Sequence, residues 1–177
     1  MPFPDWRAGA KVTAALLKQQ QVNIITPTTL QSKASITTPS ADNELTFAIE
    51  ANATYVVEFV VVFTSISTAV DLRTQWSVPA GAAGTRMCFG STSNSATATT
   101  IDDTKALVVA QTFTTNVVYQ IFDQSAQTGQ LITEIATVRN GGTAGSITFL
   151  WAQDSSSATN LSRLASNSSY VRYTRYA

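Results

Sequence analysis

The chain has 177 residues, of which 44% are hydrophobic and only 12% are charged, and its formal net charge is zero. This length suits one domain with a hydrophobic core. Eleven cations balanced by eleven anions give no basic surface for nucleic acid or an anionic membrane, so neither is an expected partner.

The first 43 residues differ in character from the rest. A short helix is predicted from Thr13, which is a suitable N-cap, and an extended connector containing Pro27 and Pro39 follows. Such a segment cannot form a core of its own. It is either a strap packed on its own domain or an arm that docks onto another subunit.

From Glu44 onward, apolar residues recur at every second position. This period predicts half-buried β-strands, with a Gly/Pro turn at 78–85 and a second turn at 139–146. A hairpin is expected over 116–137, with Gly129 in its connection. The predicted strands cover residues 44–50, 55–64, 70–78, 86–90, 105–113, 116–122, 131–139, 146–153 and 170–176.

Short strands at regular spacing, with no long helix between them, indicate an all-β fold. We predict an antiparallel β-sandwich, jelly-roll-like, over residues 44–177, preceded by an extended and short-helical arm over residues 1–43. An immunoglobulin-type sandwich is the alternative. The longest apolar run, Tyr55–Phe63, is much shorter than the roughly twenty residues of a membrane-spanning helix.

The strands carry few residues suited to catalysis. There is no histidine, which removes the commonest general base and most zinc sites. Glu58 is interpreted as an outward or interface acid, Cys88 as a buried apolar residue, and Asp102–Asp103 as a solvated turn rather than a Ca²⁺ site. We therefore expect neither an enzyme nor a bound metal or cofactor.

The strand at 170–176 mixes tyrosine and arginine on both faces. Val171, Tyr173 and Arg175 share one side, and Tyr170 and Arg172 lie on the other. Two unpaired arginines are too costly for a strand buried within one core, and tyrosine and arginine are enriched at interfaces. We predict that this strand pairs within the sheet at or near a subunit interface, with Arg172 or Arg175 meeting an acid or a carbonyl. The alternative is an ordinary edge strand with its arginines in water.

Two stretches resemble virion structural proteins of tailed phages. The opening "DWRAGAKVTAALLK" is similar to a pattern W-x-x-G-x-x-V-T-A-A-x-L-N that introduces an attachment segment, with Lys18 in place of the final asparagine. The stretch "GSITFLWAQDSSSATNLSRLASNSSYVRYTR" resembles the C-termini of minor tail and capsid-accessory proteins of actinobacteriophages. "NELTFAIEANATYVVEFVVVF" and "WSVPAGAAGT" also look like that family's central region.

The resemblance implies a trimeric β-sandwich displayed on a virion, on the capsid or on the tail. The expected partners are two further copies of the chain and the major capsid or tail proteins. The arm would dock through large apolar side chains, of which Trp6, Leu16 and Leu17 are the candidates. A receptor- or carbohydrate-binding head of a phage tail is the alternative function.

Overall fold

The computed structural model describes residues 11, 13, 21–65, 70–91, 106–120, 129–163 and 168–175. These residues form strands, turns and connections, and none of them is helical. The expected helix after Thr13 and the Asp102–Asp103 turn lie outside the described residues, as do Trp6, Leu16 and Leu17.

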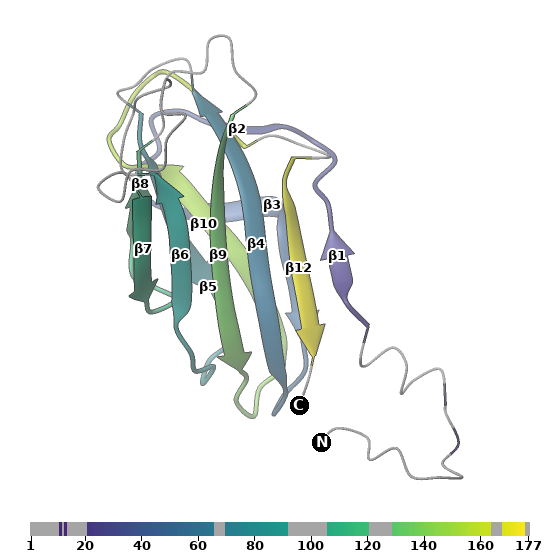
Figure 1. Ribbon diagram of the computed structural model, residues 1–177. Coiled ribbons are helices and arrows are strands. Elements are labelled where there is room, and N and C mark those ends of the chain that lie inside the picture. The colour runs from purple at the N-terminus through teal and green to yellow at the C-terminus, as the bar shows by residue number, and fades with distance from the viewer. Residues whose placement is uncertain are drawn as a thin grey trace.

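A larger, eight-stranded sheet forms one layer of the molecule (Figure 1). Its main path runs β1-β12-β4-β9-β6-β7, and two short strands, β11 and β2, extend it beside β4. All of its ladders are antiparallel. The strands are β1 (Asn23–Ile25), β2 (Gln31–Lys33), β4 (Thr54–Ser65), β6 (Arg86–Ser91), β7 (Ala106–Gln111), β9 (Gln130–Arg139), β11 (Leu161–Arg163) and β12 (Tyr170–Arg175).

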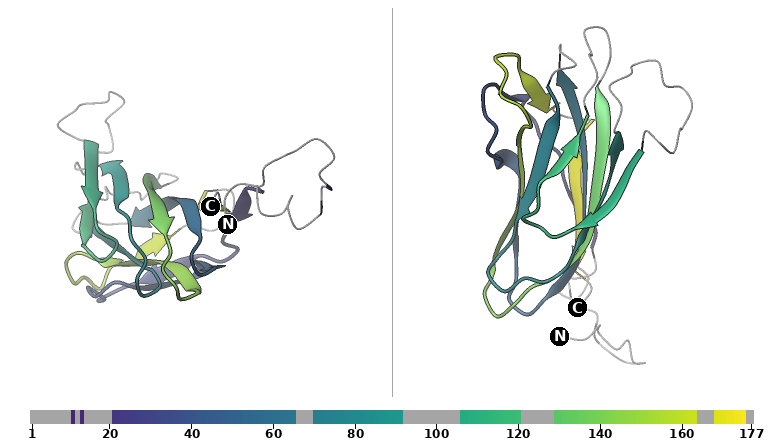
Figure 2. Two further views of the ribbon diagram at one scale, coloured as in Figure 1. Left: turned by 90° about the horizontal axis from the view of Figure 1, so that it is seen from below. Right: turned by 90° about the vertical axis from the view of Figure 1, so that its left-hand side faces the viewer.

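A smaller, four-stranded sheet forms the second layer, as the view from below in Figure 2 shows. Its order is β3-β10-β5-β8, again antiparallel throughout. The strands are β3 (Ser40–Ile49), β5 (Leu72–Ser77), β8 (Val117–Tyr119) and β10 (Gly145–Gln153).

The eight strands from β3 to β10 have the connectivity of a jelly roll. The order β3-β10-β5-β8 in one sheet faces β4-β9-β6-β7 in the other, so successive strands alternate between the sheets except at the β6–β7 hairpin. This is the double Greek-key arrangement of jelly rolls. The predicted fold class is confirmed, and the immunoglobulin-type alternative is wrong.

The predicted hairpin over 116–137 is also wrong. β8 lies in the smaller sheet against β5, and β9 lies in the larger sheet between β4 and β6. The connection that contains Gly129 therefore crosses from one layer to the other. Two successive strands show the same alternation of apolar and polar residues whether they pair with each other or face each other across the core, so the alternation could not predict which occurs here.

The second half of the expected arm contributes to the sheets. β1 pairs with β12, β2 pairs with β11, and β3 begins at Ser40. The sheets thus include residues between 23 and 43, upstream of the boundary at residue 44 that the periodicity suggested. Strands of three residues have too short a pattern to be visible in the sequence, and they form here because longer strands offer them a partner.

The core lies between the sheets and follows the predicted alternation. Phe59, at the centre of β4, contacts Trp76 edge-on, with ring centroids 4.8 Å apart, and Phe149 at 5.2 Å. Phe63 packs on Trp151 in the same way at 5.0 Å. Aromatic pairs in these arrangements each add roughly 0.5–1.5 kcal/mol beyond the burial of their area. Cys88 is buried as predicted.

A buried acid on β9, Glu134, joins the two sheets. Its carboxylate accepts hydrogen bonds from Thr74 Oγ1 (2.5 Å), Trp76 Nε1 (2.6 Å) and Tyr119 Oη (2.9 Å), all from the smaller sheet. Arg86 Nη1, on β6 of its own sheet, lies 2.5 Å away, and both charged side chains have no exposed surface. Every donor is aimed at one carboxylate, which fixes how the sheets sit on each other.

A second buried acid, Asp42 near the start of β3, also joins the two sheets. Arg163 Nε of β11 lies 2.5 Å from its Oδ2, and Trp151 Nε1 of β10 donates to the same oxygen at 3.1 Å. Its Oδ1 accepts the backbone N–H groups of Glu44 and Leu45, at 3.0 Å each. Trp76 and Trp151 thus each donate the indole N–H to a buried carboxylate.

Candidate interaction surface

The strand β12 lies between β1 and β4, so the alternative of an edge strand is wrong. Val171 pairs with Ile25 on one side and with Phe59 on the other. Because Val171 is fully buried, the alternation of the strand places Tyr170, Arg172 and Thr174 on the outer face of the sheet.

One row of side chains crosses the outer face along six strands. In register, the row runs Ile24, Arg172, Glu58, Ile135, Met87 and Ala110. Residues directly opposite one another in antiparallel strands point to the same face. Neighbouring rows add Val56, Val60, Val62, Phe89 and Leu131, because they continue the alternation of the same strands.

This surface is rich in apolar side chains that are open to solvent. We define the outer apolar face as Val56, Val62, Met87, Phe89, Leu131 and Ile135; Val60, on the same side of β4, is buried. Leu131 is 54% exposed, Met87 48% and Val56 42%. The outer side of a two-layer sandwich that faces water normally alternates to polar residues. A cluster of this kind on neighbouring strands is typical of surfaces that bind a protein, a membrane or a ligand.

The charges in the middle of the outer apolar face neutralise each other. Arg172 Nη2 lies 2.5 Å from Glu58 Oε2, and the arginine side chain is 53% exposed and the glutamate side chain 16%. The contact is an ion pair whose angles fall outside those of a hydrogen bond. Glu58 is therefore an outward acid, as predicted, and the prediction that Arg172 or Arg175 meets an acid is confirmed. The pair leaves the middle of the face without net charge.

A shallow hollow of about 320 Å³ opens at one end of this face. Met87 stands at its rim beside Gly84 and Thr85, and Arg139 and Thr137 of β9 form the opposite wall. A hollow next to exposed apolar side chains gives the surface relief that a partner's side chain could fill.

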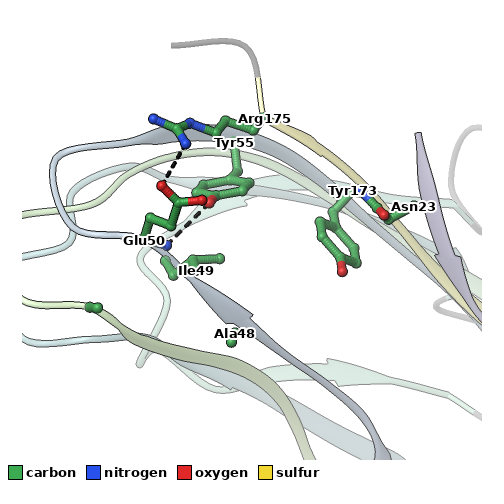
Figure 3. A pocket seen from close by; sticks show the side chains of 8 residues that line it. Asn23, Ala48, Ile49, Glu50, Tyr55, Tyr173 and Arg175 are labelled. Atoms are coloured by element: carbon green, nitrogen blue, oxygen red, sulfur yellow. Dashed lines mark hydrogen bonds and ion pairs between the residues drawn. The ribbon is translucent and has the colours of Figure 1, made fainter. Parts of the chain in front are cut away.

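A second hollow, of about 400 Å³, lies at the edge of the sandwich (Figure 3). It opens where β1 and β12 of the larger sheet approach β3 of the smaller one. We call it the edge pocket and define it by its lining residues, Asn23, Ala48, Ile49, Glu50, Tyr55, Ala144, Tyr173 and Arg175.

Aromatic and charged groups share the edge pocket. Arg175 Nη1 donates to Glu50 Oε2 at 2.6 Å, and the Glu50 side chain is 68% exposed at the mouth. Tyr55 Oη accepts the backbone N–H of Glu50 at 3.1 Å (Figure 3). The Tyr173 ring stacks on Phe47, with centroids 3.9 Å apart, and closes this side of the core. Its burial, together with nearby Tyr55, raises the pKa of Tyr173, so the hydroxyl stays protonated at neutral pH.

The structure separates the four predicted interface residues of β12 into two places. Tyr170 and Arg172 lie on the outer face, and Tyr173 and Arg175 line the edge pocket. Met87, Leu131 and Ile135 were not predicted from the sequence, because alternation shows which residues share a face but not that an outward face is apolar across neighbouring strands. The one visible signal was the presence of apolar residues on both faces of the 55–63 stretch.

The part of the chain that the structure describes shows no metal-binding cluster, and its one cysteine is unreactive. The described residues contain no group of three or more His, Cys, Asp or Glu side chains that could hold a metal ion. Burial, reinforced by nearby Glu134, raises the pKa of the Cys88 thiol to about 11, so it is not a nucleophile at neutral pH. Within the same ranges, no helix has the length and apolar character required to cross a membrane.

Comparisons with known proteins identify no family. No protein-family model matches the chain, and no curated protein matches it. Among solved structures, a chain from the structure of infectious bursal disease virus, Gt strain, is 16% identical with a TM-score of 0.24. The match covers 90% of this chain but only 38% of the viral one. A likeness this weak carries no argument about function.

Proposed function

We propose that this protein is a non-catalytic structural subunit that assembles with copies of itself through the outer apolar face. The observation that carries the proposal is the exposure of Met87, Leu131 and Val56 on adjacent strands of one sheet. The Glu58–Arg172 ion pair supports self-association, because a face that is locally neutral can approach a second copy without repulsion.

The assembly that we propose is a homotrimer displayed on a virion. The resemblance of "DWRAGAKVTAALLK" and of the 145–175 stretch to virion structural proteins of tailed phages supports this location. The N-terminal residues would attach each subunit to the major capsid or tail protein of the particle. Immunogold imaging of purified virions with antibody against this chain tests the location.

Substitution of Leu131 by lysine tests the assembly surface. Leu131 is 54% exposed in a single subunit, so a lysine there costs the subunit little, but it places an unpaired charge in the proposed interface. We expect a trimer for the unchanged protein and a monomer for Leu131→Lys in light scattering. Val118→Lys is the matched control, since Val118 is 39% exposed on the other sheet and should leave the trimer intact. A stable monomer of the unchanged protein at micromolar concentration would overturn the proposal.

Removal of residues 1–20 tests attachment to the particle. A deletion that reached residue 40 would also remove β1 and β2, which belong to the larger sheet, and would confuse loss of attachment with loss of folding. The shorter deletion spares every described strand. We expect it to leave a folded trimer that no longer co-sediments with particles.

A further inference from the structure

The long edge strand of the smaller sheet, β3, is only half covered. It pairs with β10 on one side, and no strand in the described ranges pairs with its other side. An exposed strand edge presents unpaired N–H and C=O groups that can accept a further strand.

The first half of this edge is closed by a side chain that imitates a peptide. Gln31 Oε1 accepts the N–H of Asn43 at 3.1 Å, and Gln31 Nε2 donates to the carbonyl of Ala41 at 3.5 Å. Beside it, the Glu44 carboxylate accepts hydrogen bonds from the backbone N–H and the hydroxyl of both Thr28 and Thr29. A neighbouring strand is therefore excluded along this half.

The second half of the edge, Thr46–Ile49, has no such cover among the described residues, and the edge pocket opens beside it. Ala48 and Ile49 belong to the strand and also line the pocket. A strand edge next to a side-chain cavity is the arrangement by which folded domains bind extended peptides. The backbone of the peptide joins the sheet, and one side chain enters the cavity.

We propose that the edge pocket binds residues Asp5–Arg7 of a second copy of this chain, with the Trp6 indole in the cavity and its backbone along Thr46–Ile49. This inference rests on the proposed self-assembly and adds one contact to it. The outer apolar face alone would hold the trimer when this contact is deleted, and Leu16 and Leu17 stay the candidates for attachment to the particle. Pro2 and Pro4 favour an extended backbone in residues 1–4, directly before this stretch.

Charge complementarity supports this occupant. In "DWR" an aspartate and an arginine flank the tryptophan, and the mouth of the pocket carries the opposite pair, Arg175 and Glu50, 2.6 Å apart. Asp5 would approach the guanidinium and Arg7 the carboxylate. Glu50 is accessible for this, since its side chain is 68% exposed.

The two other tryptophans of the chain indicate how Trp6 would be held. Trp76 donates its indole N–H to Glu134 and Trp151 donates to Asp42, so each is fully buried against a carboxylate. The edge pocket offers the same combination, apolar walls from Ile49, Tyr55 and Tyr173 with the carboxylate of Glu50 at the mouth. The segment between Trp6 and Asn23 can span about 55 Å when extended, which is enough to reach a neighbouring subunit.

Cross-linking between two cysteine variants of the full chain tests this contact. One copy carries Arg7→Cys and the other Ala144→Cys, because Ala144 lines the pocket and is exposed. The native Cys88 should not react with the cross-linker, since the thiol is buried and its pKa is about 11. We expect a short bis-maleimide to join the mixed copies at twice the chain mass. Trp6→Ala in the Arg7→Cys copy should lower the yield at least fivefold.

A matched position and a charge exchange serve as controls. Val118→Cys, exposed on the outer face of the smaller sheet, should give at most a fifth of the yield of Ala144→Cys. For the charges, the arm cysteine is moved to Ala8. Glu50→Arg should then lower the yield, and Arg7→Glu in the partner copy should restore it.

Three results would overturn the inference. The first is equal cross-linking at positions 118 and 144. The second is a cross-link that forms only within a single chain carrying both cysteines, at all dilutions. The third is a glycan-array signal that Tyr173→Ala abolishes, in the absence of any cross-link. If light scattering still shows a trimer in these cases, the contact fails while the proposed function stands. A monomer would mean that both fail.

Discussion

Arg86 and Glu134 form an ion pair 2.5 Å long in the interior of the sandwich, with neither side chain exposed to solvent. The guanidinium also donates to the carbonyl of Thr74 at 3.0 Å and to that of Thr115 at 2.5 Å. Charges this deep persist only when every partner is present, since each ion has lost its hydration. Loss of either member of the pair should therefore destabilise the whole domain.

Glu134→Gln is expected to lower the free energy of unfolding by about 3–5 kcal/mol, the usual cost of leaving a buried charge without its counter-ion. Urea denaturation followed by tryptophan fluorescence measures this. Asp154→Asn is the matched control, because it breaks the partly exposed Arg73–Asp154 ion pair outside the outer apolar face, where the expected loss is about 1 kcal/mol or less. Equal losses in the two variants would contradict the assignment.

Gly90→Ala is expected to destabilise the domain by about 1–3 kcal/mol through overpacking. A Cβ at Gly90 would overlap Tyr119 Cδ1, and the displaced ring would lose its hydrogen bond to Glu134. Gly142→Ala is the control, because nothing lies within 4 Å of the corresponding Cβ. Thermal unfolding should separate the two variants clearly, and a neutral Gly90→Ala would show that Tyr119 is free to move.

Residues 28 and 29 should loosen from β3 in acid. Hydrogen bonds, first from the side chain and then from the backbone of Thr28, lower the pKa of Glu44 from 4.5 to about 2. A carboxyl group with a depressed pKa in the folded state contributes stability that is complete above about 4.5 and is lost as the pH falls toward 2. The protection factors of the Thr28 and Thr29 amides, which are the intrinsic exchange rates at each pH divided by the observed rates, should fall over that window.

The matched variant for this acid effect is Thr28→Val, which removes the hydroxyl donor and keeps the shape of the side chain. It should shift the onset of exchange at Thr29 to higher pH, because the carboxyl group of Glu44 then protonates more readily. Protection factors at Thr28 and Thr29 that stay the same between pH 5 and pH 2.5 in the unchanged protein would contradict the role given to Glu44.

Arg172→Glu is expected to dissociate the assembly without unfolding the subunit. The new glutamate would face Glu58 across the ladder, and like charges directly opposite cost roughly 0.2–1 kcal/mol within a sheet. At the proposed interface the same change introduces two unpaired charges. Size-exclusion chromatography measures the assembly, and Arg73→Glu, which removes the partner of Asp154 on the smaller sheet, is the control. Loss of the trimer in both variants would argue against a specific role of the outer face.

The sequence predicted the layers of this fold better than its connections. Strands such as 55–64 and 131–139 show a clear period of two because one face packs on the core, and the structure places them as adjacent strands, β4 and β9. The partner of β8 could not be predicted, since pairing depends on how long connections cross the sandwich. β1 and β2 form strands only because β12 and β11 offer them a partner.

The candidate surface was predictable in part. Alternation placed Arg172 and Tyr173 on opposite faces of one strand, which the structure confirms. The charged core was not predicted, although Arg86 stands two residues from buried Cys88 and so shares its face. An arginine at an inward position needs an acid opposite, and only the fold shows that this acid is Glu134.

The three-residue strand β1 has a mechanical consequence for a subunit held by its N-terminal residues. Among the described strands, Asn23–Ile25 pairs only with β12. The next attachment along the chain is the set of hydrogen bonds from Thr28 and Thr29 to Glu44. A pull on the N-terminus would peel these three residues away before it loads any long strand. The freed stretch of residues 22–27 would lengthen the tether by up to about 20 Å, so that a sudden load is absorbed as extension while the body of the sandwich keeps its shape.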